Sequence, residues 1–238
     1  MSWRRPRAFA LRLHVSAAPP RGGLTQALGP MERSPAPQIG LLHLDMIAES
    51  NFAEFETALR AEGLDLRIES RPDPGPYAGI EWLIPPAIVV FLGKSYFDSF
   101  LKEAGKDHYQ ILKSAISKLS AKFFGKDAPK GRIIFTKGKA ESEHPRYSIF
   151  YSVIADLGDG YRVKLLLQSE FDAEICQEAQ EAFLDFLSSA YDGTLKPESV
   201  KGLVGADPIS QMLLVAYNPA EKSLEVIDPL AGKRTTGA

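Results

Sequence analysis

The stretch YSIFYSVIADLGDGYRVKLLLQS, residues 147–169, is the clearest indication of how the chain folds. Residues 147–156 and 161–169 are apolar and contain the aromatic and β-branched side chains typical of strands. The LGDG sequence at residues 157–160 predicts a tight turn between them, because Asp-Gly tolerates the positive φ that hairpin turns require. We therefore expect an antiparallel hairpin here.

A helix is predicted directly after this hairpin, over residues 172–191. Asp172 can accept a hydrogen bond from a free amide at the helix start, and Gly193 suits the left-handed residue that follows a helix. The side chains expected on its inner face recur at helical spacing and are Ile175, Ala179, Ala182, Phe183 and Phe186. Residues 212–217 and 224–227 then predict a second hairpin at the end of the chain.

The first regular elements are predicted to form a β-α-β unit. Residues 39–47 have the composition of a strand, and residues 64–70 alternate as a half-exposed strand does. The helix between them is expected to end near residue 62. Asn51 and Glu54 fit a capping box, in which each side chain bonds a backbone amide at the helix start.

The apolar run at residues 83–92 fits two interpretations. Its β-branched residues favour a buried strand, whereas Pro86 suits the first turn of a helix. We expect a helix that enters at Pro86, because an aromatic pattern continues beyond the run without a turn signal. A second helix is predicted over residues 107–124, and a short strand over residues 132–137.

The resulting order of elements shows no steady alternation of strand and helix, which excludes a doubly wound parallel sheet. It predicts an α+β fold, with the helices packed on one face of a mainly antiparallel sheet. We expect residues 39–238 to form a single domain. Residues 1–38 are rich in Arg, Pro and Gly, and we interpret them as a disordered tail or a mis-assigned start rather than a targeting segment.

The composition excludes several classes of protein. Apolar residues make up 45% and charged residues 24% of the chain, as in globular proteins. The single cysteine excludes an internal disulfide and favours a reducing compartment, so a cytoplasmic location is expected. A membrane-spanning helix needs about 20 apolar residues, and no run in this sequence approaches that length. We therefore expect no membrane span.

The sequence contains no complete cofactor or metal motif. Gly93-Lys94-Ser95 looks like the end of a phosphate-binding loop, but that loop requires a glycine where Ile88 stands. The four histidines lack the spacing of a zinc site. Cys176 falls on the inner side of a predicted helix, where a small packing role is expected. We expect neither a cofactor nor a metal ion.

A catalytic site would have to assemble from residues that are distant in sequence. His43 and Asp45 lie two residues apart on a predicted strand and would point to the same face. His108 and Glu170 are the other acid–base candidates. One alternative function is therefore a hydrolase or nuclease that combines these four side chains.

Charge is distributed unevenly along the chain, since residues 94–139 are basic and residues 170–198 are acidic. The residues predicted to bind a partner are Phe91, Tyr96, Phe97, Phe100, Lys102, Lys106, Lys113 and Lys118. If the basic and acidic helices meet between two copies, they make a weak, salt-sensitive homodimer through residues 86–124.

The function that this pattern favours is a non-catalytic protein-interaction or regulatory module, with a protein partner or self-association. Binding of an anionic polymer by the lysine-rich helix is a further alternative. Nucleic acid is not the expected partner, because aromatic residues are not interleaved with the lysines and the rest of the chain is acidic.

Overall fold

The computed structural model describes residues 35–73, 86–124 and 146–229 of the chain. Seven strands form one sheet in the order β2-β1-β3-β4-β5-β6-β7. The strands are β1 (Ile39–Leu44), β2 (Leu66–Arg71), β3 (Ile88–Leu92), β4 (Tyr151–Gly158), β5 (Tyr161–Leu166), β6 (Met212–Asn218) and β7 (Ser223–Val226). The helices are α1 (Ala53–Leu59), α2 (Leu101–Ala104), α3 (Lys106–Ala121) and α4 (Ala173–Tyr191), with short turns η1 (Glu49–Asn51), η3 (Tyr96–Phe100) and η4 (Pro197–Ser199).

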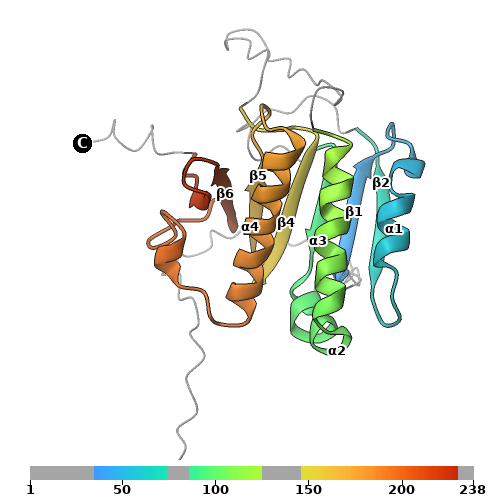
Figure 1. Cartoon of the computed structure of the whole chain (residues 1–238), viewed down its shortest axis with the longest axis horizontal. Helices are drawn as coiled ribbons and strands as arrows, with labels where there is room; N and C mark the ends of the chain where they lie inside the picture. Colours follow the sequence, from blue (N-terminus) through green and yellow to red (C-terminus); the bar gives the residue numbers. More distant parts are fainter. Residues whose placement is uncertain (1–34, 74–85, 125–145, 230–238) are drawn as a thin grey trace, which may run out of the picture. The chain divides into compact units, whose positions relative to one another are not determined.

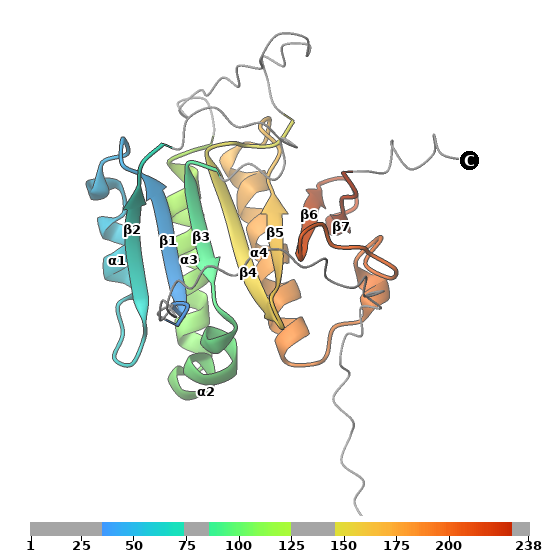
Figure 2. The same ribbon diagram turned by 180° about the vertical axis from the view of Figure 1, so that it is seen from behind.

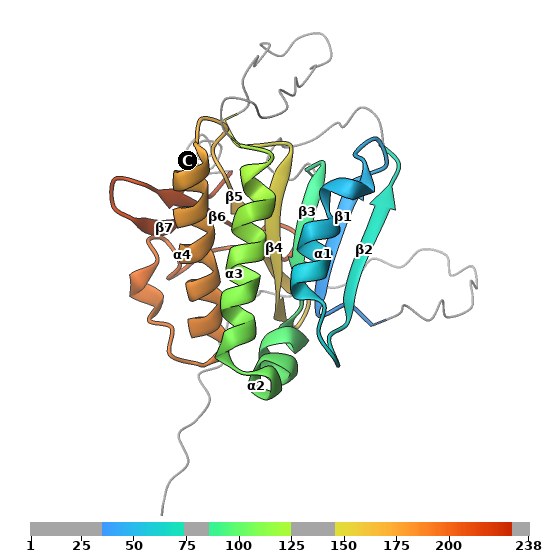
Figure 3. The same cartoon turned by 45° about the vertical axis from the view of Figure 1, so that its right-hand side comes forward.

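The helices α1, α3 and α4 lie side by side on one face of the sheet (Figures 1 and 3). Seen from behind, the strands stand in front of all three helices (Figure 2). We call the face without these helices the helix-free face. The main core lies between the sheet and the helix layer, and its largest fully buried side chains include Tyr151, Phe183 and Leu112.

The sheet is mixed, which corrects the prediction of a mainly antiparallel sheet. Parallel and antiparallel pairs alternate across it: β2 with β1, β3 with β4, and β5 with β6 are parallel, and the other three pairs are antiparallel. Each parallel pair is joined through one or two helices, as a parallel connection requires. The fold is therefore a mixed α+β fold.

Strand β3 corrects the prediction of a helix that enters at Pro86. Ile88–Leu92 pairs with β1 on one side and with β4 on the other, and its residues are nearly all buried. A strand buried on both faces is continuously apolar, so it lacks the alternation that would identify it in a sequence. The helix begins only after Gly93, where an added Cβ would lie 2.4 Å from the Pro37 carbonyl oxygen.

The predicted capping box at the first helix is wrong. Phe52 occupies the cap position of α1, and no side chain bonds the free amides there. The Asn51 side chain donates instead to the Ala48 carbonyl, at 2.9 Å. The helix also ends at Leu59, earlier than predicted. The preceding turn η1 uses Asn51 as its last residue, so this side chain is engaged before α1 starts.

The local signals in the second half of the chain are confirmed. Gly158, Asp159 and Gly160 all have positive φ in the β4–β5 turn. In the β6–β7 turn the Asn218 side chain accepts from the amides of Ala220 and Glu221. These turns are built by their own residues, which is why they could be predicted without knowledge of the tertiary structure.

Helix α4 begins as predicted, because an oxygen of Asp172 accepts the Ile175 amide at 2.9 Å. Asp172→Ala removes this bond and the favourable interaction of the carboxylate with the helix dipole. We expect it to lower the free energy of unfolding by about 1 kcal/mol. Urea denaturation of both proteins measures the difference, and Asp172→Asn, which keeps the accepting oxygen, should lose less than half as much. Equal losses would contradict a capping role.

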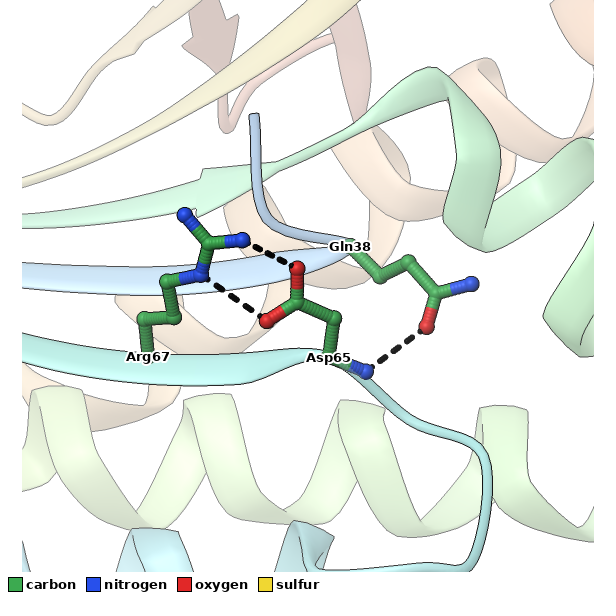
Figure 4. Close-up of polar contacts among 3 residues, drawn as sticks. All are labelled: Gln38, Asp65 and Arg67. Atoms are coloured by element: carbon green, nitrogen blue, oxygen red, sulfur yellow. Dashed lines mark hydrogen bonds and ion pairs between the residues drawn. The ribbon is translucent and has the colours of Figure 1, made fainter. Parts of the chain in front are cut away.

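A polar clamp joins the starts of β1 and β2 (Figure 4). The Asp65 carboxylate accepts two hydrogen bonds from Arg67, from Nε at 2.9 Å and from Nη2 at 2.6 Å. The Asp65 amide donates to the Gln38 side-chain oxygen, also at 2.9 Å. The Gln38 contact joins the two segments at their starts, and the Arg67 contact holds the Asp65 carboxylate at the beginning of β2.

None of the helices that the structure describes is long and apolar enough to cross a membrane. The predicted strand at residues 132–137 and most of the predicted tail at residues 1–38 lie outside the described residues.

Candidate functional site

His108 on α3 is a buried structural residue. Its Nε2 donates to the Leu59 carbonyl at 3.2 Å, and because a carbonyl can only accept, this nitrogen carries the ring proton. Its Nδ1 accepts from the Tyr96 hydroxyl at 3.1 Å. The Phe100 ring lies edge-on, with 4.8 Å between the ring centroids. Both ring nitrogens are thus engaged in joining α3 to α1 and η3.

His43 is buried at the end of β1, under the start of α1. Its ring lies 4.5 Å from that of Phe52, and its Nδ1 donates to the Leu44 carbonyl at 2.8 Å. Asp45 is exposed and lies beyond the last residue of the strand. The structure therefore places His43 in the core and Asp45 at the surface, beyond the end of the strand.

The structure does not bring the four acid–base candidates together. His43 contacts the residue before α1, whereas His108 contacts Leu59 at its other end, about 10 Å away at 1.5 Å per residue. Glu170 is exposed and follows β5, three strand positions from β1, which corresponds to about 14 Å. No group of three or more potential metal ligands occurs among the described residues.

The predicted aromatic patch belongs to the core of the chain itself. Tyr96, Phe97 and Phe100 are each at most 5% exposed, and the Phe97 ring stacks on Tyr191. Phe91 is half-buried on β3. The first three side chains therefore stabilise the fold, which corrects the expectation of an exposed aromatic surface. Residues 96–100 are helical as predicted, but their burial depends on packing against distant residues such as Tyr191, which the local pattern does not show.

The basic and acidic helices meet within one chain, whereas the sequence suggested contact between two copies or none. Lys113 of α3 lies 2.5 Å from Asp185 of α4. Lys118 lies 3.6 Å from Glu54 of α1. These pairs reduce the positive charge available to a second copy or to an anionic polymer. Lys102 is exposed, and the side chain of Lys106 lies outside the described residues.

Lys164 was not predicted as a functional residue, yet it has the most unusual environment of the described lysines. It lies on the helix-free face of β5, directly between Ile154 of β4 and Leu214 of β6. The side chain is only 6% exposed. Burial disfavours its charged form and lowers the pKa of Lys164 to about 8. Lys164 also takes part in an interaction with another group of the chain.

The clearest hollow in the described part of the chain is a cavity of about 210 Å³ beside β6 and β7, which we call the β6–β7 cavity. Its wall on the strands is apolar and consists of Met212, Leu213, Leu214, Val226 and Ile227. The opposite wall is the loop at residues 202–209. Gly202 and Gly205 give this loop its shape, since both have a φ of 79° that a side chain would disfavour.

Two Asp-Pro pairs contribute the polar groups of the cavity. Asp207-Pro208 belongs to the loop before β6, and Asp228-Pro229 follows β7. Both aspartates are exposed, so they lie where the cavity meets solvent. Each of these residues also takes part in an interaction with another group of the chain. The repetition of Asp-Pro is visible in the sequence, but only the pairing of β6 with β7 brings the two copies to one cavity.

Many backbone amides of the cavity lining already donate hydrogen bonds within the chain. The amides of Ala206, Ile209, Met212, Val226 and Ile227 donate to the carbonyls of Leu203, Met212, Ile209, Lys201 and Leu214, respectively. The two prolines have no amide hydrogen. The cavity therefore offers a ligand an apolar surface and carboxylate acceptors, with few hydrogen-bond donors.

The fold and the cavity define a mixed-sheet α+β protein with a small, partly acidic hollow at one end of its sheet. No family model, no curated protein and no solved structure matches this chain.

Proposed function

We propose that this chain is a non-catalytic protein-interaction module that binds its partner at the β6–β7 cavity. The observation that carries the proposal is the cavity itself, about 210 Å³ in volume, with an apolar wall and a rim open to solvent. A concave apolar surface with a few placed polar groups is the usual form of a binding site. The size suits one inserted side chain, because pockets for whole small-molecule ligands measure roughly 300–1,000 Å³.

The surface next to the cavity supports a protein partner. Val204, in the cavity loop, is 70% exposed and is one of three large apolar side chains exposed among the described residues. The cavity and Val204 together provide an apolar centre, and Asp207 and Asp228 provide a polar margin. Protein interfaces commonly combine an apolar centre with a polar margin.

A hydrolase is the second candidate, because two carboxylates in one cavity are the minimum set for general acid–base hydrolysis. Exposure of both aspartates favours the interaction module instead. A carboxyl group that acts as general acid is normally kept protonated by an apolar, desolvated surrounding. The described lining of the cavity also contains no histidine, lysine or hydroxyl-bearing side chain that could assist these carboxylates.

Filling the cavity should weaken binding. Ala206 lines it and is half-buried, so Ala206→Leu places three further carbon atoms in the space that a partner side chain would occupy. The full chain is immobilised and used to select from a random peptide library, and the selected peptides are measured by fluorescence anisotropy. We expect Ala206→Leu to weaken their binding at least about tenfold, which corresponds to roughly 1.4 kcal/mol.

Ala220→Leu is the matched control, because Ala220 is exposed in the β6–β7 turn and does not line the cavity. It should bind the selected peptides as the unmodified chain does. Thermal melting of both variants checks that they remain folded. The proposal is wrong if selection enriches no peptide, or if peptides bind Ala206→Leu and the unmodified chain equally.

A further inference from the structure

We infer that the partner segment carries an aliphatic side chain, which enters the β6–β7 cavity, next to lysine or arginine residues, which contact Asp207 and Asp228. This inference rests on the proposed function and specifies the chemistry of the partner. Three properties of the site support it: the apolar composition of its wall, the two carboxylates at its rim, and the hydrogen bonds that its backbone amides already make within the chain.

The apolar wall of the cavity favours an aliphatic side chain in the bound segment. Its strand side chains are Met, Leu, Val and Ile, and the described lining contains no aromatic ring. A polar side chain placed here would lose its hydration without gaining partners, because the nearby amides of Val226 and Ile227 donate to backbone carbonyls. An aliphatic side chain gives up no hydrogen bonds to water when it enters the cavity, and its removal from water is favourable.

The two aspartates at the rim of the cavity favour positively charged residues in the bound segment. Asp207 and Asp228 line the cavity from two separate loops and are both exposed, so each is accessible to a cation next to a side chain bound in the cavity. Pro208 and Pro229 follow them directly, and neither can offer an amide to an anion. Each of the two residues already takes part in an interaction within the chain, so an incoming cation binds beside existing contacts. Arg and Lys are suited to this because they donate several hydrogen bonds to carboxylates.

A metal ion or an anionic ligand does not fit these observations. No group of three potential metal ligands occurs among the described residues, and Ca²⁺ takes six to eight oxygen ligands. An anion would meet two carboxylates and few free amides. A basic peptide segment is the ligand class that agrees with the charge, the volume and the wall together.

Three fluorescein-labelled peptides test the inference with the full chain. They share flanking glycines and differ in the central three residues, which are Lys-Leu-Arg, Gln-Leu-Gln or Lys-Ala-Arg. Fluorescence anisotropy is recorded at about 50 mM and about 300 mM salt, because exposed charge pairs weaken as salt screens them. We expect Lys-Leu-Arg to bind about tenfold more tightly than either of the other two at low salt, with the charge preference reduced at high salt.

Charge variants assign this preference to the rim. In the double variant Asp207→Asn with Asp228→Asn, Lys-Leu-Arg should bind no more than about twofold better than Gln-Leu-Gln. Asp45→Asn is the control, because Asp45 is an exposed carboxylate after β1, which lies four strand positions from β6 in the sheet and does not contribute to the cavity. It should leave the preference unchanged.

The outcomes separate this inference from the proposed function. The inference is overturned if Gln-Leu-Gln binds as tightly as Lys-Leu-Arg to the unmodified chain, or if the double variant keeps the full preference. In either case, weaker binding of library-selected peptides by Ala206→Leu still supports an interaction module. If Ala206→Leu affects no peptide, both the function and the partner class are wrong.

Discussion

The variant His108→Ala is expected to lower the free energy of unfolding by about 3 kcal/mol, the largest effect that we predict. Truncation leaves a cavity in the core, because the ring is buried against Tyr96 and Phe100. It also leaves the Leu59 carbonyl and the Tyr96 hydroxyl without their partner. Urea denaturation followed by circular dichroism measures the loss.

Two sets of variants show whether the loss has this cause. Tyr96→Phe removes only the hydroxyl and should cost about 1 kcal/mol. Asp45→Ala and Glu170→Ala change the two exposed acid–base candidates and should stay within about 0.5 kcal/mol of the unmodified chain. If His108→Ala is as stable as the unmodified chain, the buried contacts described for His108 do not form. The same result would restore His108 as a candidate for a role other than packing.

The second large effect concerns Lys164 and the dependence of stability on pH. In the folded chain its pKa is lowered from 10.5 to about 8 by burial. Between these two pH values the unfolded chain holds a proton that the folded chain has lost. The free energy of unfolding therefore rises with pH in this window, by roughly 3 kcal/mol over its full width. Lys164→Met removes the titrating group and with it this rise.

The measurement compares the two proteins by urea denaturation from about pH 7 to about pH 9.5. We expect the stability of the unmodified chain, relative to Lys164→Met, to increase by about 2 kcal/mol over this range. Higher pH is avoided because burial raises the pKa of several tyrosines, that of Tyr217 to about 12. The unfolded state loses those protons first, so their contribution to stability falls as pH rises.

Lys102→Met provides the control, since Lys102 is exposed on α2. The difference in the free energy of unfolding between this variant and the unmodified chain should not change over the same pH range. If the difference in the free energy of unfolding between Lys164→Met and the unmodified chain does not change with pH, the amine keeps an ordinary pKa. In that case the helix-free face around Ile154 and Leu214 would have to be hydrated at this position.

The elements that could be predicted from the sequence are those whose signals are local. The cap at Asp172 and the turn at Asn218 depend on bonds to residues at most three positions away, and the turn at Asp159 depends on the positive φ of its own residues. The helical spacing of the apolar residues in α4 is equally local, since it reflects 3.6 residues per turn. For these parts a single sequence contained enough information.

The candidate site could not be predicted, although its residues are plain in the sequence. Asp207 and Asp228 are 21 positions apart, and each alone is an ordinary aspartate before a proline. Their relation arises only when β6 pairs with β7 and the loop at residues 202–209 closes over the strands. The acid–base candidates failed for a different reason, because His43 and His108 have suitable chemistry but are buried in packing contacts with different parts of the chain.

The sequence by itself determined the class of the protein, a mixture of strands and helices around an apolar core, together with its hairpins and the limits of α4. Only the tertiary structure decided that Ile88–Leu92 is a strand and that the sheet is mixed. Ile88 pairs with His43 and Tyr151, which lie 45 and 63 positions away. Pairing over such distances depends on which apolar surfaces can be buried together in the whole chain, and no local window of sequence contains that information.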